Sequence, residues 1–96
     1  MKIQLTPTAY RDLTRILTYL EERSPAGAHV VLLSINNSFD ILTLQPNASQ
    51  LTNHPPVRVK RITKYPYKIF YRITDDTVEI LHIRHTARYP WGKLKE

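Results

Sequence analysis

A change in the spacing of apolar residues near the middle of the chain limits the folds that the chain can adopt. From residue 9 to residue 42 the apolar residues recur every three or four positions, as they do on one face of a helix. From residue 57 to residue 85 they occupy every second position, as they do in half-buried strands. A helical part followed by a strand part predicts an α+β fold, with the helices packed on one face of a sheet.

Two start signals divide the helical part. Thr6-Pro7 and Ser24-Pro25 each place a capping hydroxyl before a proline at the first helical position. We therefore expect one helix from residue 7 to about residue 23 and a second from residue 25 or 26 to just before Pro46. Because only a few residues separate them, the two helices should form an antiparallel hairpin.

The strand part predicts a sheet. Three alternating runs between residues 57 and 85 are separated by turns at residues 64–66 and 75–76, which predicts an antiparallel meander. A short alternating run at residues 2–5 is expected to join the edge of this sheet. Residues 45–56 contain three prolines and are predicted to be a loop. The expected order is β-α-α-β-β-β in a single domain, residues 1–96.

Strict alternation also predicts which side chains share a face of the sheet. In the last run, Val78, Ile80, His82 and Arg84 should lie on one face, and Glu79, Leu81, Ile83 and His85 on the other. The same rule places Lys68 away from the helices. His82 and His85 should face opposite sides, so they cannot share a metal ion, and we expect no metal and no cofactor.

Charge is concentrated in the second half of the chain. The sequence has 14 Lys and Arg against 8 Asp and Glu, a formal net charge of +6. Most of these cations lie after residue 57, which indicates an anionic partner. The absence of cysteine excludes disulfides and thiolate chemistry. No apolar run is long enough for a signal peptide or a membrane span, so we expect a cytoplasmic protein.

The basic C-terminal half contains residue types that a metal-independent ribonuclease uses. Such an enzyme needs a base, an acid and cations that stabilise the phosphorane-like charge. His85 is a candidate base or acid and Tyr89 a weak acid, and the candidate charge stabilisers are Arg61, Lys68 and Arg88. The simpler interpretation is a solvated basic face whose side chains have no catalytic role.

Three segments of this half resemble the RelE/ParE toxins. Residues 57–62 and 65–73 resemble the two central strands of that superfamily, and residues 75–88 resemble the last strand and its exit in the ParE branch. The most specific parts are Tyr-x-Ile-Phe-Tyr-Arg at residues 67–72 and Ile-x-His-x-x-Arg at residues 83–88. The preceding strand and helix hairpin also fit, so the resemblance covers essentially the whole chain.

The resemblance implies the toxin of a type II toxin–antitoxin (plasmid stabilisation) system. Its partner would be a cognate antitoxin with an acidic or amphipathic segment. ParE-like members inhibit DNA gyrase by protein–protein contact, whereas RelE-like members are ribosome-dependent mRNA endonucleases. Laid along the RelE-like pattern, Arg61, Lys68 and Arg88 match cationic positions. Val59 stands where a second lysine is expected and Leu94 near a late tyrosine, so that catalytic set is incomplete.

The ParE branch is therefore the preferred interpretation, without a catalytic site. The candidate residues for contact with gyrase are Arg58, Arg84, His85, Arg88 and Trp91. Trp91 has an equally simple role as a cap on the core. In the alternative interpretation, an endonuclease acting on ribosome-bound mRNA, the catalytic residues are Arg61, Lys68, His85 and Arg88.

Overall fold

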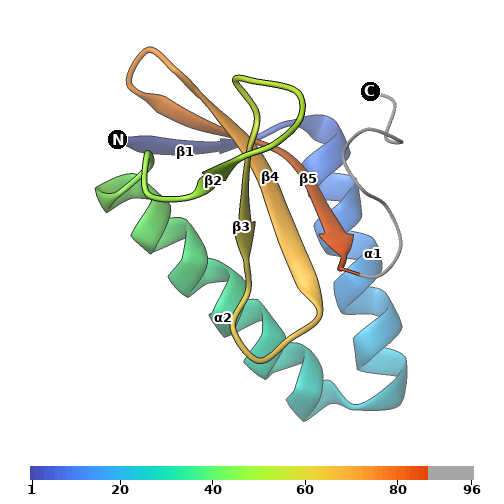
Figure 1. The fold of residues 1–96 in the computed structure, drawn as a ribbon. Helices are drawn as coiled ribbons and strands as arrows, with labels where there is room; N and C mark the ends of the chain where they lie inside the picture. The colour runs from blue at the N-terminus through green and yellow to red at the C-terminus, as the bar shows by residue number, and fades with distance from the viewer. Residues whose placement is uncertain (87–96) are drawn as a thin grey trace.

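A five-stranded sheet and two helices make up residues 1–86, which are the residues that the computed structural model describes (Figure 1). The elements are, in chain order, β1 (Lys2–Leu5), α1 (Pro7–Arg23), α2 (Pro25–Leu44), β2 (Gln50–Leu51), β3 (Arg58–Arg61), β4 (Tyr67–Thr74) and β5 (Thr77–His85). The spatial order of the strands is β1-β5-β4-β3-β2. β1 runs parallel to β5, and every other pair is antiparallel. The predicted α+β fold, the meander and the edge position of the first strand are confirmed.

Both helices begin where the capping signals predict. The Oγ1 atom of Thr6 accepts a hydrogen bond from the backbone N–H of Ala9 at 3.1 Å. The Oγ atom of Ser24 accepts one from the N–H of Gly27 at 3.0 Å. Ser24 also ends α1, since its own N–H bonds to the carbonyl of Leu20. One residue therefore separates the helices, and they diverge from this point in Figure 1.

The segment predicted to be a loop contains a short strand. Gln50 and Leu51 of β2 pair with Val59 and Arg58 of β3. Both β2 residues are exposed, so there is no alternation of buried and exposed side chains that the sequence would reveal. The guanidinium of Arg58 donates to the carbonyls of Ser49 at 2.7 Å and Asn47 at 3.2 Å, which ties this segment to the sheet.

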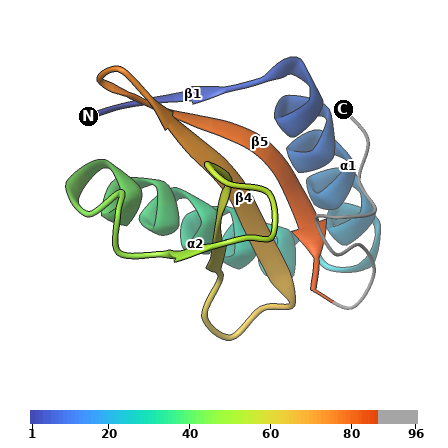
Figure 2. The same ribbon diagram turned by 45° about the horizontal axis from the view of Figure 1, so that its top comes forward.

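The main core lies between the helices and one face of the sheet. Figures 1 and 2 show α2 lying across this face and α1 alongside β5. The core side chains come from both helices and from the strands β4 and β5, and they include Ala9, Ile35, Leu42, Ile69, Tyr71 and Ile80, all with no exposed surface. This burial is the main source of stability for a domain of this size.

The opposite face of the sheet, called the outer face here, is only partly polar. Val57, Phe70 and Leu81 form a second, smaller buried cluster there, and Val59 packs against it. Lys68 lies on this outer face, as predicted, because Tyr67 and Ile69 on either side of it belong to the main core. Neither helix of the described part is long and apolar enough to cross a membrane.

Candidate functional site

A β-bulge at Leu81 interrupts the pairing of β4 with β5. Tyr71 pairs with Ile80 and Phe70 pairs with His82, so Leu81 has no opposing residue on β4. Its side chain is 2% exposed and belongs to the cluster on the outer face. The bulge changes the phase of alternation for the rest of β5.

Strict alternation therefore fails in β5, and the predicted faces of its last residues are wrong. Arg84 was expected on the face of Val78 and Ile80, with Ile83 on the opposite face. Ile83 instead pairs with Ile69 and is buried in the main core. Arg84 pairs with Lys68 on the outer face. The physical reason is the extra residue at the bulge, which shifts the side-chain period by one position.

This shift brings three cations together on adjacent strands. Arg61 of β3 pairs with Lys68 of β4, and Lys68 pairs with Arg84 of β5. Paired residues project from the same face, so the three side chains form a line across the outer face, called the cation row here. Arg61 is exposed, and Lys68 and Arg84 are half-buried. Like charges on paired residues repel each other, so an anion bound beside Arg61 and Lys68 would relieve this repulsion, whereas Arg84 already pairs with a carboxylate.

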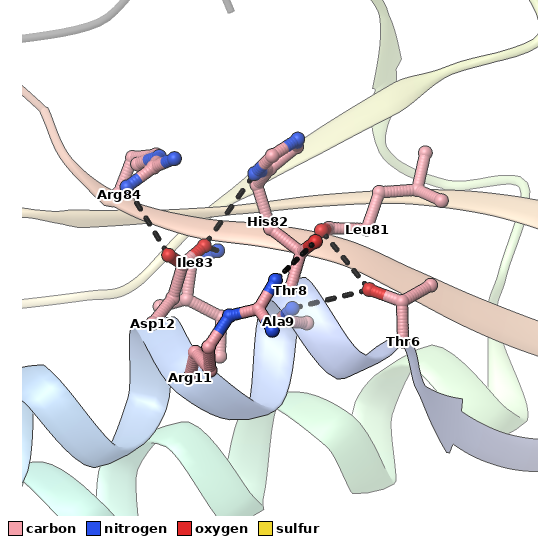
Figure 3. Close-up of polar contacts among 9 residues, drawn as sticks. All are labelled: Thr6, Thr8, Ala9, Arg11, Asp12, Leu81, His82, Ile83 and Arg84. Atoms are coloured by element: carbon pink, nitrogen blue, oxygen red, sulfur yellow. Dashed lines mark hydrogen bonds and ion pairs between the residues drawn. The ribbon is translucent and has the colours of Figure 1, made fainter. Parts of the chain in front are cut away.

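The carboxylate of Asp12 lies at the β5 end of the cation row (Figure 3). One oxygen is 3.1 Å from Nη1 of Arg84. The other accepts a hydrogen bond from the backbone N–H of Ile83 at 3.1 Å and is 3.5 Å from Nδ1 of His82. Asp12 is 4% exposed and His82 is fully buried. Asp12 thus fixes both the edge of β5 and the position of the Arg84 guanidinium.

Asp12 is a residue of this site that is not among the candidates predicted from the sequence, since a charged residue on a helix is ordinarily expected on its solvent-exposed face. The structure buries it. Its spacing carried a signal, because it follows Ala9 by three residues and precedes Ile16 by four, within the apolar stripe of the helix. A carboxylate at such a position needs a buried partner, which here is Arg84 together with a backbone N–H.

The position of Asp12 follows from the short length of β1. β1 covers the edge of β5 only from Thr77 to Ile80. Thr6 extends this contact, since its N–H donates to the carbonyl of Ile80 at 3.0 Å and its Oγ1 donates to that of Leu81 at 3.2 Å. The chain then turns into α1, and Asp12 bonds to the next free N–H of the edge (Figure 3). The side chain of Asp12 therefore accepts the backbone hydrogen bond that a longer β1 would otherwise accept at this edge.

A cavity of about 440 Å³ lies between α1 and the ends of β4 and β5. Its lining residues are Asp12, Arg15, Ile16, Tyr19, Tyr67, Ile83, Arg84 and His85. His85 pairs with Tyr67, and the two rings meet edge to face with centroids 5.8 Å apart. Because Tyr67 belongs to the main core, His85 is on the helix side of the sheet. His85 therefore lies on the opposite face from Arg61 and Lys68, whereas Arg84 lines the same cavity as His85.

The residues proposed from the sequence thus fall into separate groups. Of the candidate catalytic set, Arg61 and Lys68 are neighbours, whereas His85 is on the other face. Of the candidate target-binding set, Arg84 belongs to the cation row. Arg58 is on the helix side and donates to loop carbonyls. The predictions that involve Arg88, Tyr89, Trp91 and Leu94 lie outside the described residues.

The outer face offers little acid–base chemistry within residues 1–86. His82 lies on this face but is fully buried. Glu79 forms an ion pair with Arg72 toward the other end of β5. The described residues also contain no group of three histidine or acidic side chains that could hold a metal ion. The chemistry that this part of the face supports is the binding of an anionic surface.

Two known proteins that are similar to this chain in sequence are named as toxins. The chain is 32% identical over 80 residues to Toxin RelE2 from Caulobacter vibrioides, covering 83% of this chain and 89% of that protein. It is 32% identical over 93 residues to Putative toxin Y4kP from Sinorhizobium fredii, covering 97% of this chain and 95% of that protein. These relatives confirm the predicted RelE/ParE toxin superfamily.

The family described as "ParE toxin of type II toxin-antitoxin system, parDE" matches residues 3–90. The chain therefore belongs to the ParE family of type II toxins. Its fold is also similar to that of a chain in the structure of the chromosomal ParDE TA system from P. aeruginosa, with a TM-score of 0.76 and 23% identity. That similarity covers 88% of this chain and 95% of the other.

Proposed function

We propose that this toxin inhibits DNA gyrase by protein–protein contact and that the cation row is part of the contact surface. The observation that carries the proposal is the alignment of Arg61, Lys68 and Arg84 on one face, without an exposed acid or base beside them in the described residues. The match to the ParE family over residues 3–90 supports the same target. Arg88 and Trp91, which follow β5 in the sequence, are also proposed as residues that contact gyrase.

The cation row favours binding over cleavage for a chemical reason. RNA cleavage without a metal needs a group that removes the 2′-hydroxyl proton and a group that protonates the leaving oxygen. His85, the candidate for either role, lies on the helix side, where Arg84 is the one member of the row that lines the same cavity. The guanidinium groups of Arg61 and Arg84 stabilise charge but transfer no proton, so Lys68 is the one possible acid of the row, and the row holds no base. The row is therefore suited to an acidic protein surface.

We also propose a cognate antitoxin as the partner in the resting complex. The structural similarity to a chain of a ParDE TA system supports this partner. Acidic groups of the antitoxin would neutralise the cation row, and an antitoxin that covers the row would block the gyrase contact. Because the chain carries a net charge of +6, its association with an acidic partner should weaken as salt rises.

One observation favours the alternative, a ribosome-dependent mRNA endonuclease. Arg61 and Lys68 match two cationic positions of the RelE-like pattern, and they are direct cross-strand partners. A relative at 32% identity also carries the name RelE2. In this alternative the row would hold the phosphate of mRNA, and residues after 86 would have to supply the acid and the base.

The test is a supercoiling and cleavage assay with purified gyrase and three forms of the toxin. The wild-type toxin should abolish supercoiling or trap double-strand breaks. Arg61→Glu should reduce this inhibition at least about tenfold, as truncation of a central contact does. Lys60→Glu is the matched control, because it makes the same charge change on the adjacent residue, which projects from the other face.

Two results would contradict the proposal. Gyrase that is unaffected by wild-type toxin, together with cleavage of mRNA at the ribosomal A site in a translation extract, would establish the alternative. Equal loss of inhibition with Arg61→Glu and Lys60→Glu would show that net charge, and not the cation row, determines binding. Circular dichroism of each variant would verify that the fold is retained.

A further inference from the structure

Helix α2 is apolar on two opposite sides. Its buried side packs into the core through Val31, Ile35 and Leu42. Its other side carries a line of exposed residues, called the α2 stripe here: Val30, Leu33, Asn37, Ile41 and Leu44. The four apolar members are 46%, 50%, 46% and 81% exposed. A helix that is apolar on both sides is normally covered on both sides, so the α2 stripe indicates an interface.

The spacing within the α2 stripe is symmetric about its centre. The five residues follow one another at intervals of three, four, four and three, with Asn37 in the middle. These intervals keep all five on one narrow face of the helix. A second, antiparallel copy of α2 that crosses at Asn37 would place Leu33 opposite Ile41 and Val30 opposite Leu44. The stripe is therefore complementary to itself, as a two-fold interface requires.

The charge distribution also favours a second copy of this chain. The protein has 14 Lys and Arg, but none of them lies between Pro25 and Leu44. The only carboxylate in α2 is Asp40. In the antiparallel pairing it would lie opposite Ser34 of the second copy, away from the Asp40 of that copy. Two chains with a net charge of +6 repel each other over most of their surfaces. Helix α2 lets them approach without bringing cations together.

We propose that the antitoxin-free toxin forms a two-fold dimer through the α2 stripe, with the two α2 helices antiparallel and Asn37 at the axis. Asn37 would pair with its own copy by a side-chain hydrogen bond, which fixes the register as buried asparagines do in helix pairs. A single helix pair buries less than the roughly 800 Å² per partner of a standard interface, so the dimer should dissociate in the micromolar range. This proposal does not depend on whether the target is gyrase or the ribosome.

Disulfide cross-linking of the full chain tests the proposal, because the natural sequence has no cysteine. Asn37→Cys should form a covalent dimer when the oxidant diamide takes up the electrons of the two thiols. Val30→Cys is the matched control on the same stripe. In the antiparallel pairing its two copies are about 21 Å apart along the helices, too far for a disulfide. Val30→Cys mixed with Leu44→Cys should cross-link again.

Sedimentation velocity on variants without cysteine gives an independent measurement. Leu33→Glu should raise the dissociation constant of the dimer at least about tenfold, because it places a charge against an apolar side chain of the partner copy. Tyr10→Glu is the control, since Tyr10 is 65% exposed but lies on α1, outside the stripe. It should leave the dissociation constant unchanged. Circular dichroism would check the fold of both variants.

Several outcomes would overturn the proposal. Equal cross-linking of Asn37→Cys and Val30→Cys would indicate parallel helices or nonspecific contact. A toxin that remains monomeric at about 100 μM would exclude a dimer of the expected strength. A monomeric toxin whose affinity for the antitoxin falls with Leu33→Glu but not with Tyr10→Glu would identify the antitoxin as the occupant of the α2 stripe.

Discussion

The carboxylate of Asp12, in the first helix, lies 3.1 Å from the guanidinium of Arg84, near the end of the last strand. The same carboxylate accepts a hydrogen bond from the N–H of Ile83. This one side chain therefore connects the start of the chain to the cation row. Its burial makes the connection important for stability as well as for the geometry of the site.

Replacement of Asp12 should destabilise the fold. Asp12→Ala removes the acceptor of the Ile83 N–H and the partner of Arg84, so we expect a loss of about 2–4 kcal/mol in the free energy of unfolding. Asp12→Asn retains one acceptor and should lose less. Urea unfolding of the antitoxin-free toxin would measure both. Asp40→Ala, at an exposed site, should change stability by less than about 0.5 kcal/mol.

Thr6 should contribute more than an ordinary N-cap. Its hydroxyl caps α1 and also donates to the carbonyl of Leu81, whereas the hydroxyl of Ser24 only caps α2. Thr6→Val should therefore cost about 2 kcal/mol, and Ser24→Ala about 1 kcal/mol. Thermal unfolding of the two variants side by side would test this order. A larger loss for Ser24→Ala would contradict the double role of Thr6.

The bulge at Leu81 should be detectable by thiol labelling. Ile83 is 1% exposed and faces the main core, whereas Arg84 is half-buried on the outer face. The thiol of Arg84→Cys should react with a disulfide reagent more than about tenfold faster than that of Ile83→Cys, which reacts only after local opening. Regular alternation through β5 would give the opposite order. Labelling rates in native buffer and in urea would separate exposure from intrinsic reactivity.

Arg58 should matter for stability and not for target contact. Its guanidinium donates to two carbonyls of the β2 segment. Arg58→Ala should cost about 1–2 kcal/mol, and growth inhibition should fall only in proportion to the loss of folded protein. Arg61→Ala, on the exposed row, should lower inhibition with little change in stability. A strong loss of gyrase inhibition by a fully folded Arg58→Ala would restore Arg58 to the target surface.

Much of the fold could be predicted because its signals are local. The Thr6-Pro7 and Ser24-Pro25 pairs set the helix starts, and the change of apolar period separated the helices from the sheet. Lys68 could be placed on the outer face because its two neighbours in β4, Tyr67 and Ile69, are core residues and successive side chains of a strand point to opposite faces. In each case the determining interaction lies within a few residues of the signal.

The site was harder to predict because its geometry depends on distant contacts. The bulge in β5 is a property of its pairing with β4, and nothing in Ile80-Leu81-His82 marks it. The resulting line of Arg61, Lys68 and Arg84 could not be found by counting along one strand. Asp12 could not be recognised from the sequence for a similar reason, since a buried carboxylate is acceptable only where the fold supplies its partners.

The way in which Asp12 and Thr6 cover the edge of β5 also limits where other chains can attach. An uncovered edge strand is a template for any extended peptide, including a segment of a partner or of another molecule in an unwanted aggregate. Here that template is occupied from Thr77 to Ile83 by β1, Thr6 and Asp12 in succession. Within residues 1–86, the edges of the sheet that remain for a partner strand are the outer side of β1 and the β3–β2 end. Either choice sets the direction from which the rest of that partner reaches the cation row.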